Sequence, residues 1–133
     1  MSYPNNVAII DDDEALRLSL GALMRAYGIA AQLFETADAF LGADQSPFDC
    51  VVADVHMPGT DGITMLERLR ERGNQVPVII ISALDTDSTR QRAIAKGADN
   101  YFPKPVDAAA LVKFMAGLAS SQRGASLESG ARA

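Results

Sequence analysis

The amino-acid sequence predicts an α/β fold, a three-layer α/β/α sandwich in which a parallel five-stranded sheet lies between two layers of helices. Two observations lead to this expectation. Five short apolar runs of strand length alternate with stretches in which apolar residues recur every three or four positions. The chain has 133 residues, of which 48% are hydrophobic, and this suffices for one buried core. Strands that alternate with helices need right-handed crossovers, which produce a parallel sheet covered on both faces.

The first predicted unit extends from residue 7 to Gly28. Residues 7–10 form a continuous apolar run, typical of a strand that is buried on both faces, and the run ends at Asp11. A helix follows, with Asp13 or Glu14 at its positively polarised end and Gly28 as its stop. Its apolar face consists of Leu16, Leu20, Leu23, Met24 and Tyr27.

Two further units follow. Their strands are residues 30–34 and 50–53, and both runs are rich in apolar side chains. The second helix is short, with Thr36 as its N-cap, and the third helix is stopped by Gly73. The apolar positions of these two helices are Phe40, Leu41, Ile63, Leu66 and Leu69.

The last two units complete the sheet. Residues 78–81 are four β-branched residues in a row, which predict the fourth strand, and Ser82 ends it. The helix after it, residues 87–96, offers only Ile94 and several alanines as an apolar face, so it should be weakly anchored. Residues 100–102 are a short fifth strand, and the final helix has an inward face of Leu111, Val112, Met115 and Leu118.

One domain is expected, from residue 5 to residue 119, and residues 120–133 are interpreted as a polar C-terminal tail or a truncated linker. That segment is too short for a DNA-binding helix-turn-helix unit, so the chain is either a stand-alone domain or the N-terminal part of a longer protein. The flavodoxin-like strand order 2-1-3-4-5 is the natural candidate for a doubly wound sheet of this size.

Composition excludes several classes of function. The net charge is −5 and Lys and Arg form no dense cluster, so direct nucleic-acid binding is not expected. No apolar stretch is long enough to cross a membrane, so the sequence predicts a soluble, cytoplasmic protein. The single cysteine, Cys50, lies in an apolar run and is predicted to be a buried core residue.

Aspartates have two predicted roles. Those that precede helices are interpreted as N-caps, namely Asp13, Asp61, Asp87 and Asp107. Asp11, Asp12 and Asp54 instead occupy the ends of two predicted strands at one edge of the sheet, so capping does not explain them together.

The strand-end residues predict a ligand site. In a parallel sheet the carboxyl ends of the strands lie together, and ligands bind where the strand order reverses. Asp11 and Asp12 end the first strand, Asp54 the third and Ser82 the fourth, and Lys104 follows the fifth. Three close carboxylates repel one another, and Mg²⁺ is the hard cation that best suits an open acidic pocket handling phosphate. The Lys104 ammonium and the Ser82 hydroxyl would then contact phosphoryl oxygens.

These residues resemble the receiver domain of bacterial two-component response regulators. The segment IIDDDE (9–14) is similar to the acid pair of that family, and VVADVHMPGTDG (51–62) is similar to its phosphoacceptor loop almost residue for residue. Residues 77–83 and 98–105 are similar to its Ser/Thr and Lys-Pro segments. The resemblance covers residues 5–119 and is strongest to the N-terminal receivers of transcriptional regulators with a helix-turn-helix output.

The resemblance implies a phosphoacceptor switch, not an enzyme beyond its own phosphorylation and slow autodephosphorylation. It implies that Asp54 accepts a phosphoryl group from a sensor histidine kinase, with Mg²⁺ as the cofactor. Asp12 would bind the ion directly, Asp11 would assist through water, and the backbone carbonyl of His56 would complete the protein ligands.

The resemblance also implies how the signal leaves the site. Lys104 would pair with the phosphoryl oxygens, Ser82 would move to hydrogen-bond one of them, and Tyr101 would swing inward as the coupled aromatic switch. The Lys104-Pro105 peptide bond is the candidate cis bond. The face formed by the fourth helix, fifth strand and fifth helix would change and would mediate a phosphorylation-dependent homodimer.

Three residues depart from the commonest family pattern. Pro103 directly precedes Lys104 and stiffens the loop. His56 and Leu84 stand two positions after Asp54 and Ser82, where family members tune the lifetime of the phosphoryl group. Leu84 has no group that orients an attacking water, so slow self-dephosphorylation is expected, while His56 is read equally well as a solvated loop residue.

Other functions fit less well. A hydrolase that uses Asp54 as nucleophile would need a second acid at position 56, which is histidine. A flavodoxin would need a Ser/Thr/Gly-rich phosphate loop after the first strand, where this chain has three acids. A calcium-binding loop and a Walker-type nucleotide loop are absent from the sequence. A receiver fold that serves only as an interaction module remains the third alternative.

Overall fold

The computed structural model describes residues 3–84 and 86–118 and has the predicted parallel sheet, in the order β2-β1-β3-β4-β5. Its strands are β1 (Asn6–Ile10), β2 (Ala30–Phe34), β3 (Cys50–Asp54), β4 (Val78–Ser82) and β5 (Asn100–Pro103). The connecting helices are α1 (Glu14–Ala26), α2 (Ala37–Leu41), α3 (Gly62–Glu71) and α4 (Asp87–Ala95), and residues 108–118 form a further helix after β5. The predicted tail at 120–133 lies outside the described residues. In the described ranges, no helix is both long and apolar enough to traverse a bilayer.

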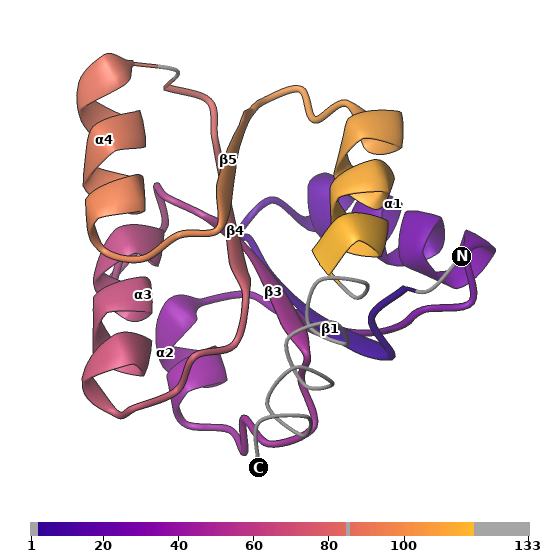
Figure 1. Ribbon diagram of the computed structural model, residues 1–133, viewed down its shortest axis with the longest axis horizontal. Helices are drawn as coiled ribbons and strands as arrows, with labels where there is room; N and C mark the ends of the chain where they lie inside the picture. The colour runs from indigo at the N-terminus through magenta and orange to yellow at the C-terminus, as the bar shows by residue number, and fades with distance from the viewer. Residues whose placement is uncertain (1–2, 85, 119–133) are drawn as a thin grey trace, which may run out of the picture.

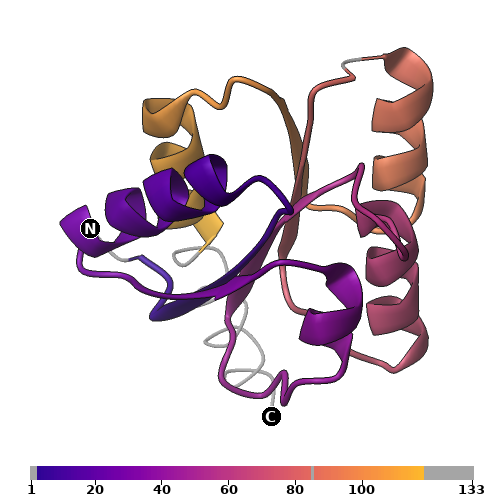
Figure 2. The ribbon, with the colours of Figure 1, turned by 180° about the vertical axis from the view of Figure 1, so that it is seen from behind.

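The sheet separates two layers of helices. Figures 1 and 2 show α2, α3 and α4 on one face, and α1 with the C-terminal helix on the other. Neighbouring side chains of a strand point to opposite faces, so Val7 and Ile9 pack into one core and Ala8 and Ile10 into the other. Every residue of β3 and β4 is buried, which explains their uninterrupted apolar runs. Cys50 is buried as predicted, and its burial raises the pKa of the thiol to about 12.

The helix starts follow the predicted caps, with one exception. The prediction that Asp87 caps α4 is wrong: the Thr86 hydroxyl accepts the hydrogen bond from the backbone N–H of Thr89, and Asp87 is the first helical residue. A carboxylate in the first turn is still favourable beside the positive end of the helix dipole. The caps that are confirmed, each accepting a backbone N–H three residues later, are Asp13, Thr36, Asp61 and Asp107.

Helix α4 has polar contacts with α3 at its C-terminal end. The predicted apolar role of Ile94 is wrong, because its side chain is 52% exposed, whereas Ala93 is buried. One buried alanine is a small apolar anchor, in line with the predicted weak attachment of this helix. The contacts with α3 are the ion pair of Lys96 with Glu67 at 2.5 Å and the hydrogen bond from Arg70 to the carbonyl of Gly97 at 2.9 Å.

Candidate functional site

Four of the predicted site residues lie at the carboxyl-terminal edge of the sheet. Asp11 directly follows β1, Asp54 ends β3, Ser82 ends β4, and Lys104 follows β5. All strand pairs are parallel, so these positions fall on the same edge although they are far apart in sequence.

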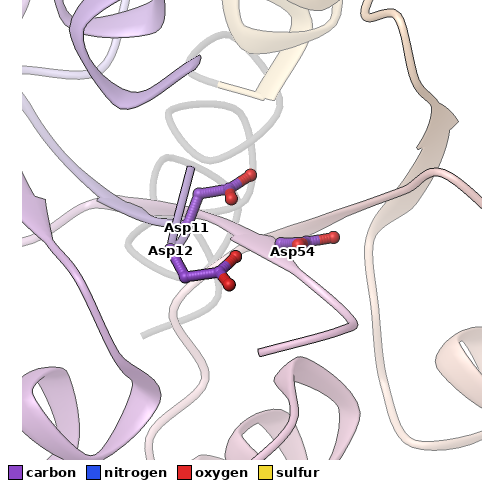
Figure 3. Close-up of side chains that lie close together, drawn as sticks. All are labelled: Asp11, Asp12 and Asp54. Atoms are coloured by element: carbon purple, nitrogen blue, oxygen red, sulfur yellow. The ribbon is translucent and has the colours of Figure 1, made fainter. Parts of the chain in front are cut away.

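Three carboxylates form the acidic part of the site (Figure 3). One oxygen from each of Asp11, Asp12 and Asp54 lies within 4.8 Å of the other two. Asp11 and Asp54 are buried, whereas Asp12 is exposed. In Figure 3, the carboxylates of Asp11 and Asp12 extend from the end of β1 toward the side on which Asp54 lies. Carboxylate oxygens at this spacing can share one divalent cation.

The ammonium group of Lys104 lies between the two buried carboxylates. Its Nζ is 2.9 Å from Asp11 Oδ2 and 3.3 Å from Asp54 Oδ2. The backbone N–H of Lys104 donates a hydrogen bond to the carbonyl of Ser82 over 2.8 Å, which ties the residue to the end of β4. The next peptide bond, Lys104–Pro105, is cis. The site therefore contains a positioned positive charge beside the Asp54 carboxylate.

Asp11 provides a test of whether the residues suit a metal ion. Its Oδ1 accepts a hydrogen bond from the backbone N–H of Asp13 over 2.9 Å. Its Oδ2 is buried and close to Lys104, but among the described residues no donor reaches it with hydrogen-bond geometry. A buried carboxylate oxygen in this situation is stabilised by a cation. Because the donors are all carboxylate oxygens, the set fits Mg²⁺ better than a softer metal.

The surroundings raise the pKa of Asp54. The main cause is desolvation by burial, followed by the negative charge of Asp11, while Lys104 and the backbone N–H of His56 act in the opposite direction. For Lys104, burial works to lower the pKa, but the carboxylates of Asp11 and Asp54 outweigh it and the pKa is raised. Lys104 therefore stays protonated at neutral pH, whereas the ionised form of Asp54 is disfavoured by its environment.

Asp54→Asn is expected to raise the unfolding temperature at neutral pH when no divalent cation is added. A carboxyl group with a raised pKa binds more protons in the folded than in the unfolded protein. The free energy of unfolding therefore decreases as the pH rises above the ordinary value of 3.8 and through the raised one. The neutral amide removes this penalty, so the difference between variant and wild type should vanish at acidic pH. Thermal unfolding followed by circular dichroism across this pH range measures it.

Asp12→Asn is the matched control, because it removes the same charge from an exposed position of the same site. Its effect on the unfolding temperature at neutral pH should be smaller than that of Asp54→Asn. An Asp54→Asn variant that unfolds at a lower temperature than the wild type at neutral pH would contradict the expectation.

A hydrogen-bonded group links Ser82 and Tyr101 through the backbone of Leu84. The buried Ser82 hydroxyl donates to the carbonyl of Leu84 over 3.2 Å and accepts from the N–H of Leu84 over 3.1 Å. The Tyr101 hydroxyl donates to the same carbonyl over 2.7 Å. The Tyr101 side chain is 3% exposed, so its ring already occupies an inward position. The side chains of His56 and Leu84 are exposed.

Two residues contribute to the site that the sequence did not single out for a role of their own. Gly62 begins α3, and a Cβ atom at this position would overlap the backbone carbonyl oxygen of Asp54. Arg90 of α4 places its guanidinium carbon 4.8 Å from the centroid of the Tyr101 ring. Gly62 could have been found from its place in the loop motif, whereas nothing in the sequence joins Arg90 to Tyr101.

A family model and several known proteins match most of this chain. A family model described as the response regulator receiver domain matches residues 7–116. The transcriptional regulatory protein FixJ of Bradyrhizobium diazoefficiens is 36% identical over 108 residues, which are 80% of this chain and 53% of FixJ. The response regulator protein TodT of Pseudomonas putida is 35% identical over 100 residues, which are 74% of this chain and 44% of TodT. The chain thus spans about half the length of these curated relatives.

A solved structure agrees with the sequence matches. The receiver domain of the Francisella response regulator 1452 superposes with a TM-score of 0.81 at 26% identity, covering 89% of this chain and 98% of that one. The similarity therefore extends over nearly the whole of the solved domain.

Proposed function

The chain belongs to the response regulator receiver family, and from this premise we propose that Asp54 accepts a phosphoryl group from a sensor histidine kinase. The domain is then a signalling switch, which catalyses only its own phosphorylation and slow dephosphorylation. The observation that supports this most strongly is the position of Lys104 Nζ, 3.3 Å from Asp54 Oδ2 at the edge of the sheet where parallel strands present ligands.

In the transfer step, a carboxylate oxygen of Asp54 forms a bond to phosphorus. The bond between phosphorus and the donor nitrogen breaks, and its electron pair stays on that nitrogen. Lys104 is already beside the accepting carboxylate and pairs with the oxygens of the arriving group. The hydroxyl of Ser82 leaves the carbonyl of Leu84 and donates to one of those oxygens.

We assign the Mg²⁺ ligands to the carboxylates of Asp11, Asp12 and Asp54 and to the backbone carbonyl of His56. The exposed Asp12 binds the ion directly, and the buried Asp11 assists through water. When bound, Mg²⁺ supplies positive charge that offsets the repulsion between the carboxylates and the phosphoryl oxygens. The spacing of the three acids supports this assignment.

The output of the switch is a shift between two arrangements of Ser82, Tyr101 and α4. The face formed by α4, β5 and the C-terminal helix is the proposed signalling surface, and a phosphorylation-dependent homodimer through this face is the proposed contact. Its weakly attached helix supports this choice, because one buried alanine is its main apolar anchor. Control of transcription by a further domain, and a cytoplasmic location, belong to the same proposal and follow from the kind of relatives matched.

Intact mass after incubation with acetyl phosphate and Mg²⁺ tests the proposal. The wild type should gain about 80 Da, the mass of one phosphoryl group on a nucleophilic carboxylate. Neither Asp54→Asn nor the wild type with a chelator should gain mass. Asp44→Asn is the matched control, because Asp44 is exposed and lies outside the site, and it should gain mass like the wild type.

The outcomes separate the alternatives. A gain of mass by Asp54→Asn would place the phosphoacceptor at another residue. If the wild type gains nothing from acetyl phosphate, a phosphorylated histidine donor is the second test. Failure with both donors would leave the domain as an interaction module that keeps only the fold.

The phosphoryl group on Asp54 is expected to be long-lived, with a half-life of minutes or more after the donor is removed. Leu84 is 53% exposed and apolar, so it offers no group to orient an attacking water. Leu84→Gln should shorten the half-life severalfold, whereas Leu18→Gln, at an equally exposed position (54%), should not. The decay of the mass gain with time measures this, and a wild-type half-life of seconds would refute it.

A further inference from the structure

We propose that Arg90 is a positioning residue that holds the Tyr101 ring in its buried position and thereby favours release of Ser82 toward the phosphoryl group. The inference rests on the proposed function and adds to it a role for a residue of α4. It draws on the stacking contact between Arg90 and Tyr101, and on a carbonyl shared by Tyr101 and Ser82.

The contact has the geometry of a cation–π interaction. The guanidinium carbon of Arg90 is 4.8 Å from the centroid of the Tyr101 ring, within the roughly 6 Å over which such attraction operates. Arg90 is exposed, whereas the ring is 3% exposed, so the guanidinium lies between the ring and solvent. Rotation of the ring toward solvent would break this contact.

The carbonyl of Leu84 couples the ring to Ser82. It accepts hydrogen bonds both from the Tyr101 hydroxyl at 2.7 Å and from the Ser82 hydroxyl at 3.2 Å. Ser82 must give up this bond before it can donate to a phosphoryl oxygen on Asp54. If the ring is buried, the carbonyl keeps the bond from Tyr101, and no acceptor is left unsatisfied. If the ring is turned outward, the Tyr101 hydroxyl no longer donates to the carbonyl of Leu84. The departure of Ser82 then removes the second of the two side-chain donors to that carbonyl.

Arg90, in the first turn of α4, therefore shifts the equilibrium of the Tyr101 ring toward its buried position. Binding of the phosphoryl group and burial of the ring are linked, so a contact that stabilises the buried ring also strengthens phosphoryl binding. The gain in affinity is at most the factor by which the contact favours the buried ring over the exposed one. An exposed cation–π contact corresponds to about a two- to fivefold change in an equilibrium constant. The expected effect of Arg90 on phosphoryl binding is thus a modest factor that is transmitted through the Tyr101 ring.

The test is the dissociation constant of beryllofluoride, an analogue of the phosphoryl group, measured by titration in the presence of Mg²⁺. Arg90→Met keeps an apolar stem and removes the cation, and it should weaken binding about two- to fivefold. Arg90→Lys retains the charge and should recover part of the loss. Arg92→Met, which removes the same charge from an exposed position on the same helix, should leave the constant unchanged.

The decisive comparison is made in a Tyr101→Leu background. There Arg90→Met should have no effect, because the ring through which it acts is missing. An equal loss in both backgrounds, or a loss for Arg92→Met as large as for Arg90→Met, would show a general effect of charge and overturn the proposal. If the wild type and Arg90→Met bind beryllofluoride equally well, the proposed role of Arg90 is refuted but the proposed function of the domain is not. A wild type that does not bind it at all contradicts the proposed function itself.

Discussion

Gly62→Ala is expected to lower the free energy of unfolding by about 1–3 kcal/mol and to slow phosphorylation of Asp54 strongly. The added methyl group would overlap the backbone carbonyl of Asp54, and backbone atoms cannot move aside as the end of a flexible side chain can. The N–H of Gly62 also donates to the carbonyl of Val55 over 3.0 Å, so the start of α3 cannot shift away freely.

Any relaxation of this overlap displaces Asp54. A displacement of about 1 Å at a reacting group costs on the order of a hundredfold in rate, so the initial rate of mass gain from acetyl phosphate should fall by that order. Urea unfolding and intact mass measure the two effects on one preparation.

Gly117→Ala is the control for Gly62→Ala. Gly117 lies in the C-terminal helix, and a Cβ atom there would meet no atom within 4 Å. Because alanine is the better helix former, this variant should be up to about 1 kcal/mol more stable than the wild type and should be phosphorylated at the same rate. Equal behaviour of the two glycine variants would refute the packing argument.

Phe40→Ala should have the largest effect on stability, a loss of about 3–5 kcal/mol. Phe40 has no exposed surface, and its ring lies 5.3 Å from that of Phe34 and 5.7 Å from that of Phe48, measured between centroids. The three rings join α2 to the sheet and to the segment before β3, so truncation leaves a cavity that the short helix cannot fill. A loss of this size is a large fraction of the total stability of a small domain.

Phe40 is not a site residue, so the folded fraction of Phe40→Ala should still accept a phosphoryl group at low temperature. Tyr27→Ala serves as its control, because this aromatic side chain is 44% exposed and should contribute less to the free energy of unfolding. Thermal unfolding of both variants, with mass gain measured well below the transition, separates stability from chemistry. A Phe40→Ala protein that unfolds like the wild type would contradict the role of the ring cluster.

The sequence allows much of the fold to be predicted, because its signals are local and repeated. The buried runs ending in Asp11, Asp54 and Ser82 predict both the strands and their shared edge, since parallel strands present their carboxyl ends together. The three carboxylates lie together at that edge, and Lys104 pairs with those of Asp11 and Asp54.

The two wrong predictions, the N-cap and the buried residue of α4, arise where the local sequence is compatible with two structures. Thr86 and Asp87 are adjacent and both can cap a helix, and the structure uses the first. In α4 the polar and apolar residues do not define one face, so the rotation of the helix about its axis depends on the rest of the fold, and Ala93, not the larger Ile94, is turned inward.

The loop motif points to Gly62, but neither its close approach to Asp54 nor the contact of Arg90 with Tyr101 can be derived from local sequence. Each depends on how closely two elements approach, which is a property of the assembled domain. The overlap at Gly62 arises because the chain reverses direction between β3 and α3. The stacking of Arg90 depends on the position of α4 against β5.

The attachment of α4 at its C-terminal end gives this helix the form of a lever. Glu67 and Arg70 of α3 hold its C-terminal end, while its other end contacts the sheet through the ring of Tyr101. A helix that is held at one end can tilt about that end, and the displacement of its residues then increases toward the opposite end. At a rise of 1.5 Å per residue, the helix is about 13 Å long, and a tilt of about 10° moves its first turn by about 2 Å. In the proposed switch, a rearrangement of one side chain beside Asp54 would thereby become a movement at the surface where a partner protein would bind.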